Sequence, residues 1–403
     1  MLPRLRADLD LMPSPVPDKP GLLIRDPFHF SDATLIIPPH MVECLTFFDG
    51  EQSSLDLRAH LVRLTGTVDV GEVEQHLVDT LSEAGFLEDD AFAQRKFHAE
   101  QAFASAPARL AQHAGSGYPE DVADLKEEFE QYLGGPESEA GQVLGIAAPH
   151  VSPFGGIESY RAAYRSLTPA DALRTFVVLG TSHYGEPERF GLTRKPFVTP
   201  FGATMPAFSL IDELESNGGD AVRMEDYCHA IEHSIEFQVV FLQHLFGPDI
   251  RVLPILCGSF LRSVYEGGLP EGAENVARMF GALGDMAARE GSNLCWVLGV
   301  DMAHMGRRYG DHFTALADRG EMTEVARRDR GRISCMESGD ARGFWERVQE
   351  DKDERQAELK WCGSSPIYTF LRAMPQARGR LKQYQQWNID ETSVVSFAGM
   401  KFS

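Results

Sequence analysis

The sequence has few cysteines, a deficit of basic residues and no long hydrophobic run. Its six cysteines are far apart and form no CxxC pair, which argues against a disulfide framework and against a four-thiolate zinc site. Lys and Arg number 38 against 60 Asp and Glu, and the net charge of −22 disfavours binding to nucleic acid. No apolar run approaches the roughly 18 residues that a membrane span needs, and residues 1–20 lack the order of a signal peptide. We therefore expect a cytoplasmic protein with reduced thiols and with neither nucleic acid nor a membrane as its partner.

The apolar content is sufficient for a sizeable core, because 43% of the residues are hydrophobic. A length of 403 residues predicts two or three domains at roughly 150 residues per domain. Residues 1–20 end in a proline-rich stretch and are expected to be a mobile tail. Residues 21–90 are expected to form a small helical domain with a strand wing, and residues 91–109 a polar linker helix. The sequence pattern changes after this linker, so residues 110–403 are assigned to one large domain.

Two helices are expected in the small domain. A capping-box pattern at Ser53 opens the first, and apolar residues recur at helical spacing until Gly66. The second is expected to begin near Asp69 and to end at Gly85, just before Phe86, which could open a strand.

The large domain shows short apolar runs separated by helical stretches. Such runs are typical of strands in a mostly parallel sheet with helices on both faces. The predicted class is therefore α/β, and the expected strands are residues 143–147, 176–179, 252–256, 295–300 and 394–397.

Three of these strands run directly into a histidine. The first two are followed by His150 and His183, and the fourth is followed by Asp301 and His304. In open α/β sheets the ligand crevice lies outside the carboxyl ends of the strands, so these side chains should converge there. A single histidine in such a place is more often a structural residue, but three together with an aspartate indicate a functional site.

A further pair of histidines occurs in the stretch CHAIEHSIEFQVVFL. Apolar residues at helical spacing predict one continuous helix here, which would place His229 and His233 one turn apart on the same face, with Glu232 beside them. The order His-x-x-Glu-His is also that of inverted zincins, in which two such histidines hold zinc. A zinc hydrolase is therefore an alternative to be weighed.

The ligand types limit the choice of metal. Neutral imidazoles with a carboxylate or thiolate suit iron, copper or zinc, whereas calcium and magnesium require more oxygen ligands. Histidines that do not bind the metal can serve as general acid or base near neutral pH.

Six motifs resemble the Memo family in their order. They are GIAAPHVSPFGG, VVLGTSHYG, EHSIEFQVVFL, GVDMAHMGRRYG, WCGSSPIYTF and SVVSFAGMKF. Bacterial and archaeal members of this family are called AmmeMemoRadiSam system protein B, and the resemblance runs from about Leu110 to the C-terminus. It implies a fold similar to class III extradiol dioxygenases, with a metal-capable pocket at the strand ends.

The resemblance also implies roles for individual residues. The family's metal-site motifs carry over to His150, His183 and Cys362, the last of which spacing alone would pass as a buried structural thiol. His233, Asp301 and His304 match further pocket residues, and together with His229 they are the predicted catalytic groups. The thiolate favours iron or copper, although zinc would tolerate the same ligands.

The segment LLIRDPFHFSDATLIIPPHMVECLTFFDG, followed by LVDTLSEAGFLEDD, resembles the PqqD-like winged-helix fold, which grips peptides. A purely structural helical cap is the alternative for this region.

The bacterial family name implies an Amme-type partner protein and a radical SAM enzyme. The leading hypothesis is therefore a Memo-family protein with a redox-metal pocket, acting with a partner protein or on a small organic substrate. The alternatives are a non-catalytic module that binds a peptide or phosphopeptide in the same pocket, and a zinc hydrolase.

Overall fold

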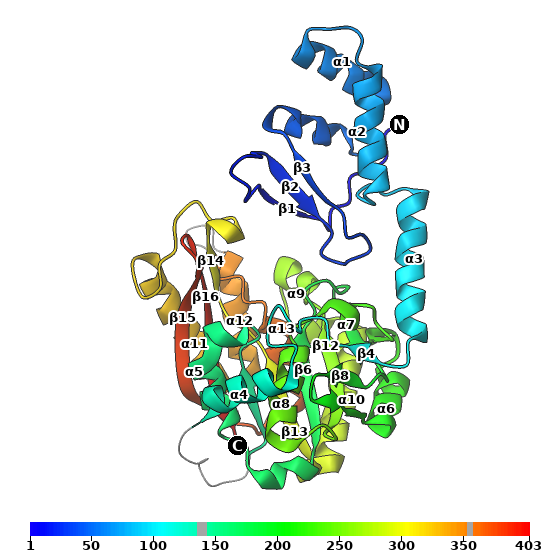
Figure 1. Ribbon diagram of the computed structural model, residues 1–403. Helices are drawn as coiled ribbons and strands as arrows, with labels where there is room; N and C mark the ends of the chain where they lie inside the picture. The colour runs from blue at the N-terminus through cyan, green and yellow to red at the C-terminus, as the bar shows by residue number, and fades with distance from the viewer. Residues whose placement is uncertain (135–142, 353–357) are drawn as a thin grey trace. The chain divides into compact units, whose positions relative to one another are not determined.

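The computed structural model describes residues 1–134, 143–352 and 358–403 (Figure 1). The chain forms two compact units, Met1–Ser105 and Ala106–Ser403. In the part of the chain that is described, no helix combines the length and the apolar character needed to cross a lipid bilayer.

The N-terminal unit begins with an antiparallel sheet in the order β1-β2-β3. The strands are β1 (Asp10–Pro13), β2 (Leu22–Arg25) and β3 (Thr34–Ile37), and they are followed by η1 (Pro39–Phe47), α1 (Ser54–Thr65), α2 (Gly71–Glu83) and α3 (Asp90–Ser105). The two predicted helices are confirmed as α1 and α2. The predicted capping box of α1 forms between Ser53 and Asp56, and Gly66 ends this helix with a positive φ of 72°, which a residue without a Cβ adopts readily. At Phe86, where a strand could begin, the structure has one isolated bridge between Leu5 and Leu87.

The prediction of a mobile tail over residues 1–20 is wrong. β1 lies within this range and pairs with β2, and the side chains of Leu2 and Arg6 are buried. The Arg6 guanidinium forms an ion pair with Asp26 at 3.0 Å and donates a hydrogen bond to the Gly85 carbonyl oxygen at 2.9 Å. These long-range contacts order the segment, and proline content alone could not reveal them.

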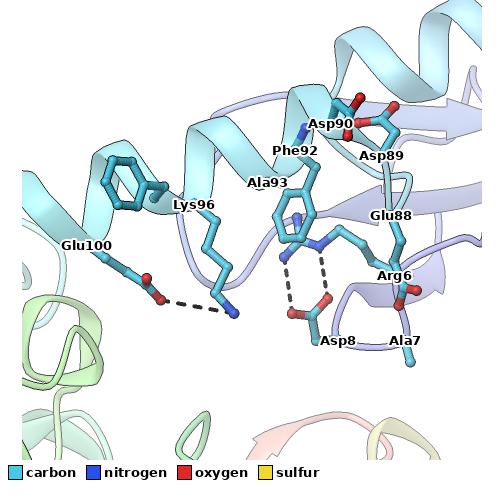
Figure 2. Close-up of a pocket in the computed structure, with 11 residues that line it drawn as sticks. Arg6, Ala7, Asp8, Glu88, Asp89, Asp90, Phe92, Ala93, Lys96 and Glu100 are labelled. Atoms are coloured by element: carbon cyan, nitrogen blue, oxygen red, sulfur yellow. Dashed lines mark hydrogen bonds and ion pairs between the residues drawn. The ribbon is translucent and has the colours of Figure 1, made fainter.

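Arg6 also lines a cavity of about 680 Å³ between the start of the chain and α3. Figure 2 shows the Phe92 ring against the Arg6 guanidinium, whose Cζ lies 4.0 Å from the ring centroid. Asp8 pairs with Arg6, and Lys96 pairs with Glu100. The two clusters of metal-capable side chains found among the described residues lie elsewhere.

The C-terminal unit is built on a large sheet in the order β11-β7-β12-β6-β13-β5-β16-β14, with β10 beside β12 and β15 beside β16. Its centre consists of four parallel strands: β12 (Arg251–Cys257), β6 (Thr175–Thr181), β13 (Leu294–Gly299) and β5 (Gly145–Ala148). Antiparallel strands flank this centre, among them β7 (Phe190–Leu192), β14 (His304–Gly306), β15 (Gly379–Asp390) and β16 (Ser393–Phe402). The smaller strands are β10 (Met205–Pro206) and β11 (Val222–Met224). All five predicted strands are therefore confirmed as members of one sheet.

Helices cover both faces of this sheet. Side chains alternate along β6, so Val177 and Leu179 join one apolar cluster and Phe176 and Val178 join the other. The first cluster includes apolar residues of α6 (Phe208–Gly218), α10 (Glu274–Glu290), α11 (Glu321–Ser338), α12 (Ala341–Gln349) and α13 (Ser364–Ala373). The second includes those of α4 (Val122–Leu133), α5 (Pro153–Tyr164) and α8 (Glu236–Phe246). The predicted α/β class with a mostly parallel sheet is confirmed.

The register of the central strands determines where the site lies. Gly299 at the end of β13 pairs with Ala148 at the end of β5 and with Gly180 near the end of β6. The three strands are parallel, so the loops after them leave the sheet at the same edge.

Candidate metal centre

Two of the three side chains of the candidate centre come from these loops. His150 follows β5 by two residues, and His183 follows β6 by two residues. Their rings lie in an edge-to-face arrangement with centroids 5.0 Å apart. The predicted convergence of these two histidines is therefore found in the structure.

Cys362, the third side chain, lies just before α13. Its Sγ is 3.2 Å from His150 Nε2, and Thr181 Oγ1 donates a hydrogen bond to its carbonyl oxygen. The next residue, Gly363, donates its N–H to the Asp301 carbonyl oxygen, and a Cβ at Gly363 would lie 2.6 Å from that oxygen. Only glycine fits this close approach, so Gly363 brings the thiol against the strand ends.

Each of the two imidazoles is held by a hydrogen bond at Nδ1. The Nδ1–H of His150 donates to the Gly299 carbonyl oxygen at 2.9 Å, and the Nδ1–H of His183 donates to the Glu232 carboxylate at 3.0 Å. Both acceptors lack a proton to give, so Nδ1 is the donor in each ring, and Nε2 is the nitrogen that could bind a metal, in His183 after its Nε2 proton is lost. One ligand atom from each of His150, His183 and Cys362 lies within 4.8 Å of the others, so these three residues could hold a metal ion.

The predicted continuous helix that carries His229 and His233 is wrong. α7 (Cys228–Ile231) ends before Glu232, and α8 does not begin until Glu236. Glu232 is extended, with φ −72° and ψ 136°, and its carboxylate accepts hydrogen bonds from both the N–H and the Nδ1–H of His183. Ser234 Oγ donates to the Thr181 carbonyl oxygen at 2.8 Å. These side-chain hydrogen bonds to β6 and its loop take the place of another helical turn.

The break in the helix separates the two histidines. The His233 ring stacks on His183 with centroids 5.0 Å apart and lies edge-on to His150 at 5.1 Å. His229 instead packs against Phe197, and its Nε2 faces the Gly191 carbonyl oxygen at 3.0 Å. The structure therefore places His233 in the cluster and does not place His229 there.

Asp301 and His304, the predicted pocket residues after β13, flank the cluster. Asp301 accepts the backbone N–H of His150 at 2.9 Å, and its Oδ2 lies 3.5 Å from His150 Nε2. His304 donates its Nδ1–H to the Met302 carbonyl oxygen at 2.9 Å, and its ring packs on Tyr309 with centroids 5.0 Å apart. Asp301 thus both holds the loop of His150 and presents a carboxylate oxygen to its ring.

Burial and mutual charge set the ionisation of the cluster. Burial lowers the pKa of His183, but the Glu232 carboxylate and Cys362 outweigh this effect and raise it well above its usual range. Burial likewise raises the pKa of Glu232, but His183 outweighs this and lowers it. Burial and the neighbouring histidines lower the pKa of His150 and His233. The metal-free cluster therefore holds its positive charge on His183, against Glu232.

The two flanking groups respond to burial in opposite directions. Burial raises the pKa of Asp301 to about 7, against the opposing effect of the N–H groups of His150 and Val151. Burial lowers the pKa of His304 to about 4. Low-dielectric surroundings disfavour the charged form in both cases.

Sequence reasoning missed the role of Glu232. The helical pattern assigned it to a stripe beside the histidines, whereas the structure uses it to fix His183. Its position directly before His233 was the available signal, but the break of the helix was not visible in the apolar spacing. Tyr309, which packs on His304, was also missed.

The fold and the cluster define an α/β protein with a two-histidine, one-cysteine site capable of holding a metal at the carboxyl edge of a mostly parallel sheet. The model of the Memo-like protein family matches residues 109–401. The chain belongs to this family.

Named relatives agree with this assignment. A MEMO1 family protein of Aquifex aeolicus is 25% identical over 385 residues, covering 94% of this chain and 95% of the relative. A MEMO1 family protein of Thermus thermophilus is 28% identical over 296 residues, covering 72% of this chain and 78% of the relative. One from Methanosarcina barkeri is 26% identical over 297 residues, covering 71% and 97%. The Aquifex alignment is too long to be confined to the C-terminal unit, so it extends into the N-terminal unit.

Proposed function

We propose that this protein binds a redox-active metal, iron or copper, through His150, His183 and Cys362 and acts as an oxidoreductase. The observation that carries the proposal is the orientation of the two imidazoles. Each ring is fixed by a hydrogen bond at Nδ1, His150 Nε2 lies 3.2 Å from the Cys362 thiol, and one ligand atom from each of the three residues lies within 4.8 Å of the others. Such outer hydrogen bonds orient the histidine ligands of known metal sites.

A second cluster, His183, Glu232 and His233, also brings three ligand atoms within 4.8 Å. A metal there would have to displace the hydrogen bonds between Glu232 and His183. A metal bound by His150, His183 and Cys362 leaves these hydrogen bonds intact, so we disfavour the second cluster as the metal site. Glu232 is thus better suited to orient His183 than to bind the metal itself.

The thiol favours a redox metal over a purely structural one. Two imidazoles and a thiolate leave coordination positions open, and iron or copper bound there would supply electron transfer to or from a substrate. Zinc would accept the same ligands, so the donor set alone leaves zinc as an alternative. The zinc hydrolase hypothesis that depended on His229 and His233 has lost its basis, because these residues are not on one helix.

The protein's own residues supply proton handling around this position. The His233 ring is in contact with both proposed histidine ligands, and Asp301 and His304 flank the cluster. We assign His233 and Asp301 to hold or move a proton beside a bound substrate, and His304 to support that side of the pocket. The likeness to class III extradiol dioxygenases that the family resemblance implies is consistent with these assignments.

The test is anaerobic reconstitution with Fe(II) or Cu(I), followed by exposure to oxygen. A redox site changes its optical or paramagnetic resonance spectrum, and Cys362→Ser removes any band that depends on the thiolate. A silent spectrum together with stoichiometric zinc in the protein as isolated would overturn the redox proposal. Full occupancy with no turnover of any offered substrate would favour the second candidate function, a module that binds a peptide or phosphopeptide in the same pocket.

For the N-terminal unit we propose a role in binding peptide or a partner protein. Its sheet has two edge strands, β1 and β3, and edge strands can pair with an added peptide strand. The likeness of this region to PqqD-like domains supports the same role. The family resemblance implies Amme-type and radical SAM proteins as the partner classes. We also propose that the protein is located in the cytoplasm. Isotope-edited NMR of the full chain with a candidate peptide would test the binding role, since added strands shift the amide signals of an edge strand.

A further inference from the structure

A cavity of about 300 Å³ lies directly beside the proposed metal centre. His183 and Cys362 form part of its wall, together with Thr181 and Ser182. One part of the remaining wall is apolar and aromatic, with Phe260, Leu261, Val264, Trp345, Val348 and Trp361, and another part is polar, with serines and the charged residues Arg332, Asp351, Glu358 and Lys360. A cavity of this size and lining fits a small organic molecule with an apolar body.

One buried charge in this wall is incompletely paired. The Arg332 side chain, which is 2% exposed, donates from Nη2 to Asp351 at 2.6 Å and to the Arg347 carbonyl oxygen at 3.0 Å. Within residues 1–134, 143–352 and 358–403, Arg332 Nη1 has no hydrogen-bond partner. Asp351 is shared with Arg328, so one carboxylate serves two guanidinium groups.

The neighbouring charges do not satisfy this donor. The Asp329 carboxylate accepts hydrogen bonds from Trp361, Tyr384 and Ser396. Lys360, also in the cavity wall, pairs with Asp311 at 2.7 Å, and Glu358 lies at the exposed rim. Asp351 balances the charge of Arg332, but an N–H group of a buried guanidinium without an acceptor is unfavourable, so Arg332 Nη1 is suited to an anion that enters the cavity.

We propose that this cavity binds a small carboxylic acid with an apolar or aromatic body. Its carboxylate accepts a hydrogen bond from Arg332, its body packs on Trp345 and Phe260, and its far end faces His183 and Cys362. This inference deepens the proposed function, because it names the substrate class of the same site. Arg332 is the specificity-determining residue: a neutral analogue of the same shape would leave its guanidinium unpaired.

The first test compares two probes on the unaltered protein by isothermal titration calorimetry. The probes are 3-phenylpropionate and the neutral, nearly isosteric 3-phenylpropanamide. The acid is expected to bind about 10- to 100-fold more tightly, as is usual when a buried charge-assisted hydrogen bond is lost. Equal affinities, or no binding of either probe, would overturn the proposal.

The second test uses two variants of the same helix. Arg332→Met keeps the length of the side chain and leaves Asp351 paired with Arg328, and it should abolish the preference for the acid. Arg327→Met is the matched control, because Arg327 is exposed and pairs with Glu324 outside the cavity; it should retain the preference. If Arg332→Met does not fold, the comparison of acid and amide on the unaltered protein still decides the question.

Each titration is run on chelator-treated and on metal-loaded protein. The preference for the acid should be present in both states, since it depends on Arg332. A preference that appears only with metal would place the carboxylate on the metal and overturn the assignment to Arg332. Metal content is measured separately, so a failure of the proposed metal centre is distinguishable from a failure of the anion site.

Discussion

The Glu232 carboxylate accepts two hydrogen bonds from one residue, the N–H of His183 at 2.7 Å and its Nδ1–H at 3.0 Å. This pair fixes both the backbone and the ring of His183. Glu232 makes these contacts in an extended conformation, with φ −72° and ψ 136°, where the chain leaves the helix before His233. The contact thus links a local break of the helix to the orientation of a proposed metal ligand.

Replacement of Glu232 tests this link. Glu232→Gln should retain the fold but lower the affinity for Fe(II) or Cu(I) by about 10- to 100-fold, as for other outer-sphere partners of ligating histidines. Competition with a chromophoric chelator measures this affinity. Glu213→Gln, which removes a carboxylate paired with Arg289 on the surface, is the control and should bind metal normally. Unchanged affinity in Glu232→Gln would show that His183 does not need this partner.

A second prediction separates ligands from neighbours. His150→Ala and His183→Ala should lose most of their metal. His233→Ala should retain its metal but lose turnover, because we assign His233 to proton transfer and not to metal binding. Elemental analysis of freshly purified variants gives the metal content, and His312→Ala provides an exposed-histidine control. Loss of metal from His233→Ala as complete as from His150→Ala would make His233 a ligand and favour the second cluster.

The parts of the fold that were predictable from sequence depend on local patterns. Apolar runs identified the central strands, and a histidine two residues after β5 and β6 placed two ligands at one edge. Cys362 was accessible only through the family resemblance, because nothing in its local spacing distinguishes it from a buried structural thiol. Its role depends on Gly363 fitting against Asp301, which is a long-range contact.

The two structural errors have a common cause. The helix expected through His233 is broken by side-chain hydrogen bonds from Glu232 and Ser234 to the loop and end of β6. The tail expected over residues 1–20 is ordered by the contacts of Arg6 with Asp26 and Gly85. In both places tertiary contacts decide the local conformation, and a short sequence window contains only one of the partners.

The N-terminal unit should fold on its own. It has a separate apolar cluster that joins the start of the chain, the sheet and the helices, with Ile24, Leu57, Leu81 and Phe86 fully buried. A protein of residues 1–105 is expected to show native-like circular dichroism and one cooperative thermal transition. A fragment without a cooperative transition would mean that these helices need residues 106–403, and the unit would then not be an independent domain.

The last prediction concerns a buried ion pair outside the metal centre. The Glu236 carboxylate pairs with Arg109 and accepts hydrogen bonds from the Tyr118 hydroxyl and from the backbone N–H groups of Gln112 and His113. These groups join the first residues of the C-terminal unit to α8. Burial raises the pKa of Glu236, but Arg109, His113 and Tyr118 outweigh it, and the pKa lies below the ordinary value of 4.5.

A lowered pKa in the folded state sets the direction of the pH dependence. At pH values above the ordinary pKa of glutamate, ionised Glu236 contributes its full stabilisation to the folded protein. This stabilisation is lost as the pH falls from the ordinary pKa to below the lower pKa of Glu236 in the folded state. Glu236→Gln leaves Arg109 buried without its charge partner, so at pH 7 it should cost about 3–5 kcal/mol of unfolding free energy. The difference between the two proteins should shrink below about pH 4, which urea unfolding at several pH values measures. Glu130→Gln, in an exposed pair with Lys126, is the control and should show no such difference. A difference that stays constant from pH 7 to pH 3 would show that packing, and not the charge of Glu236, stabilises this junction.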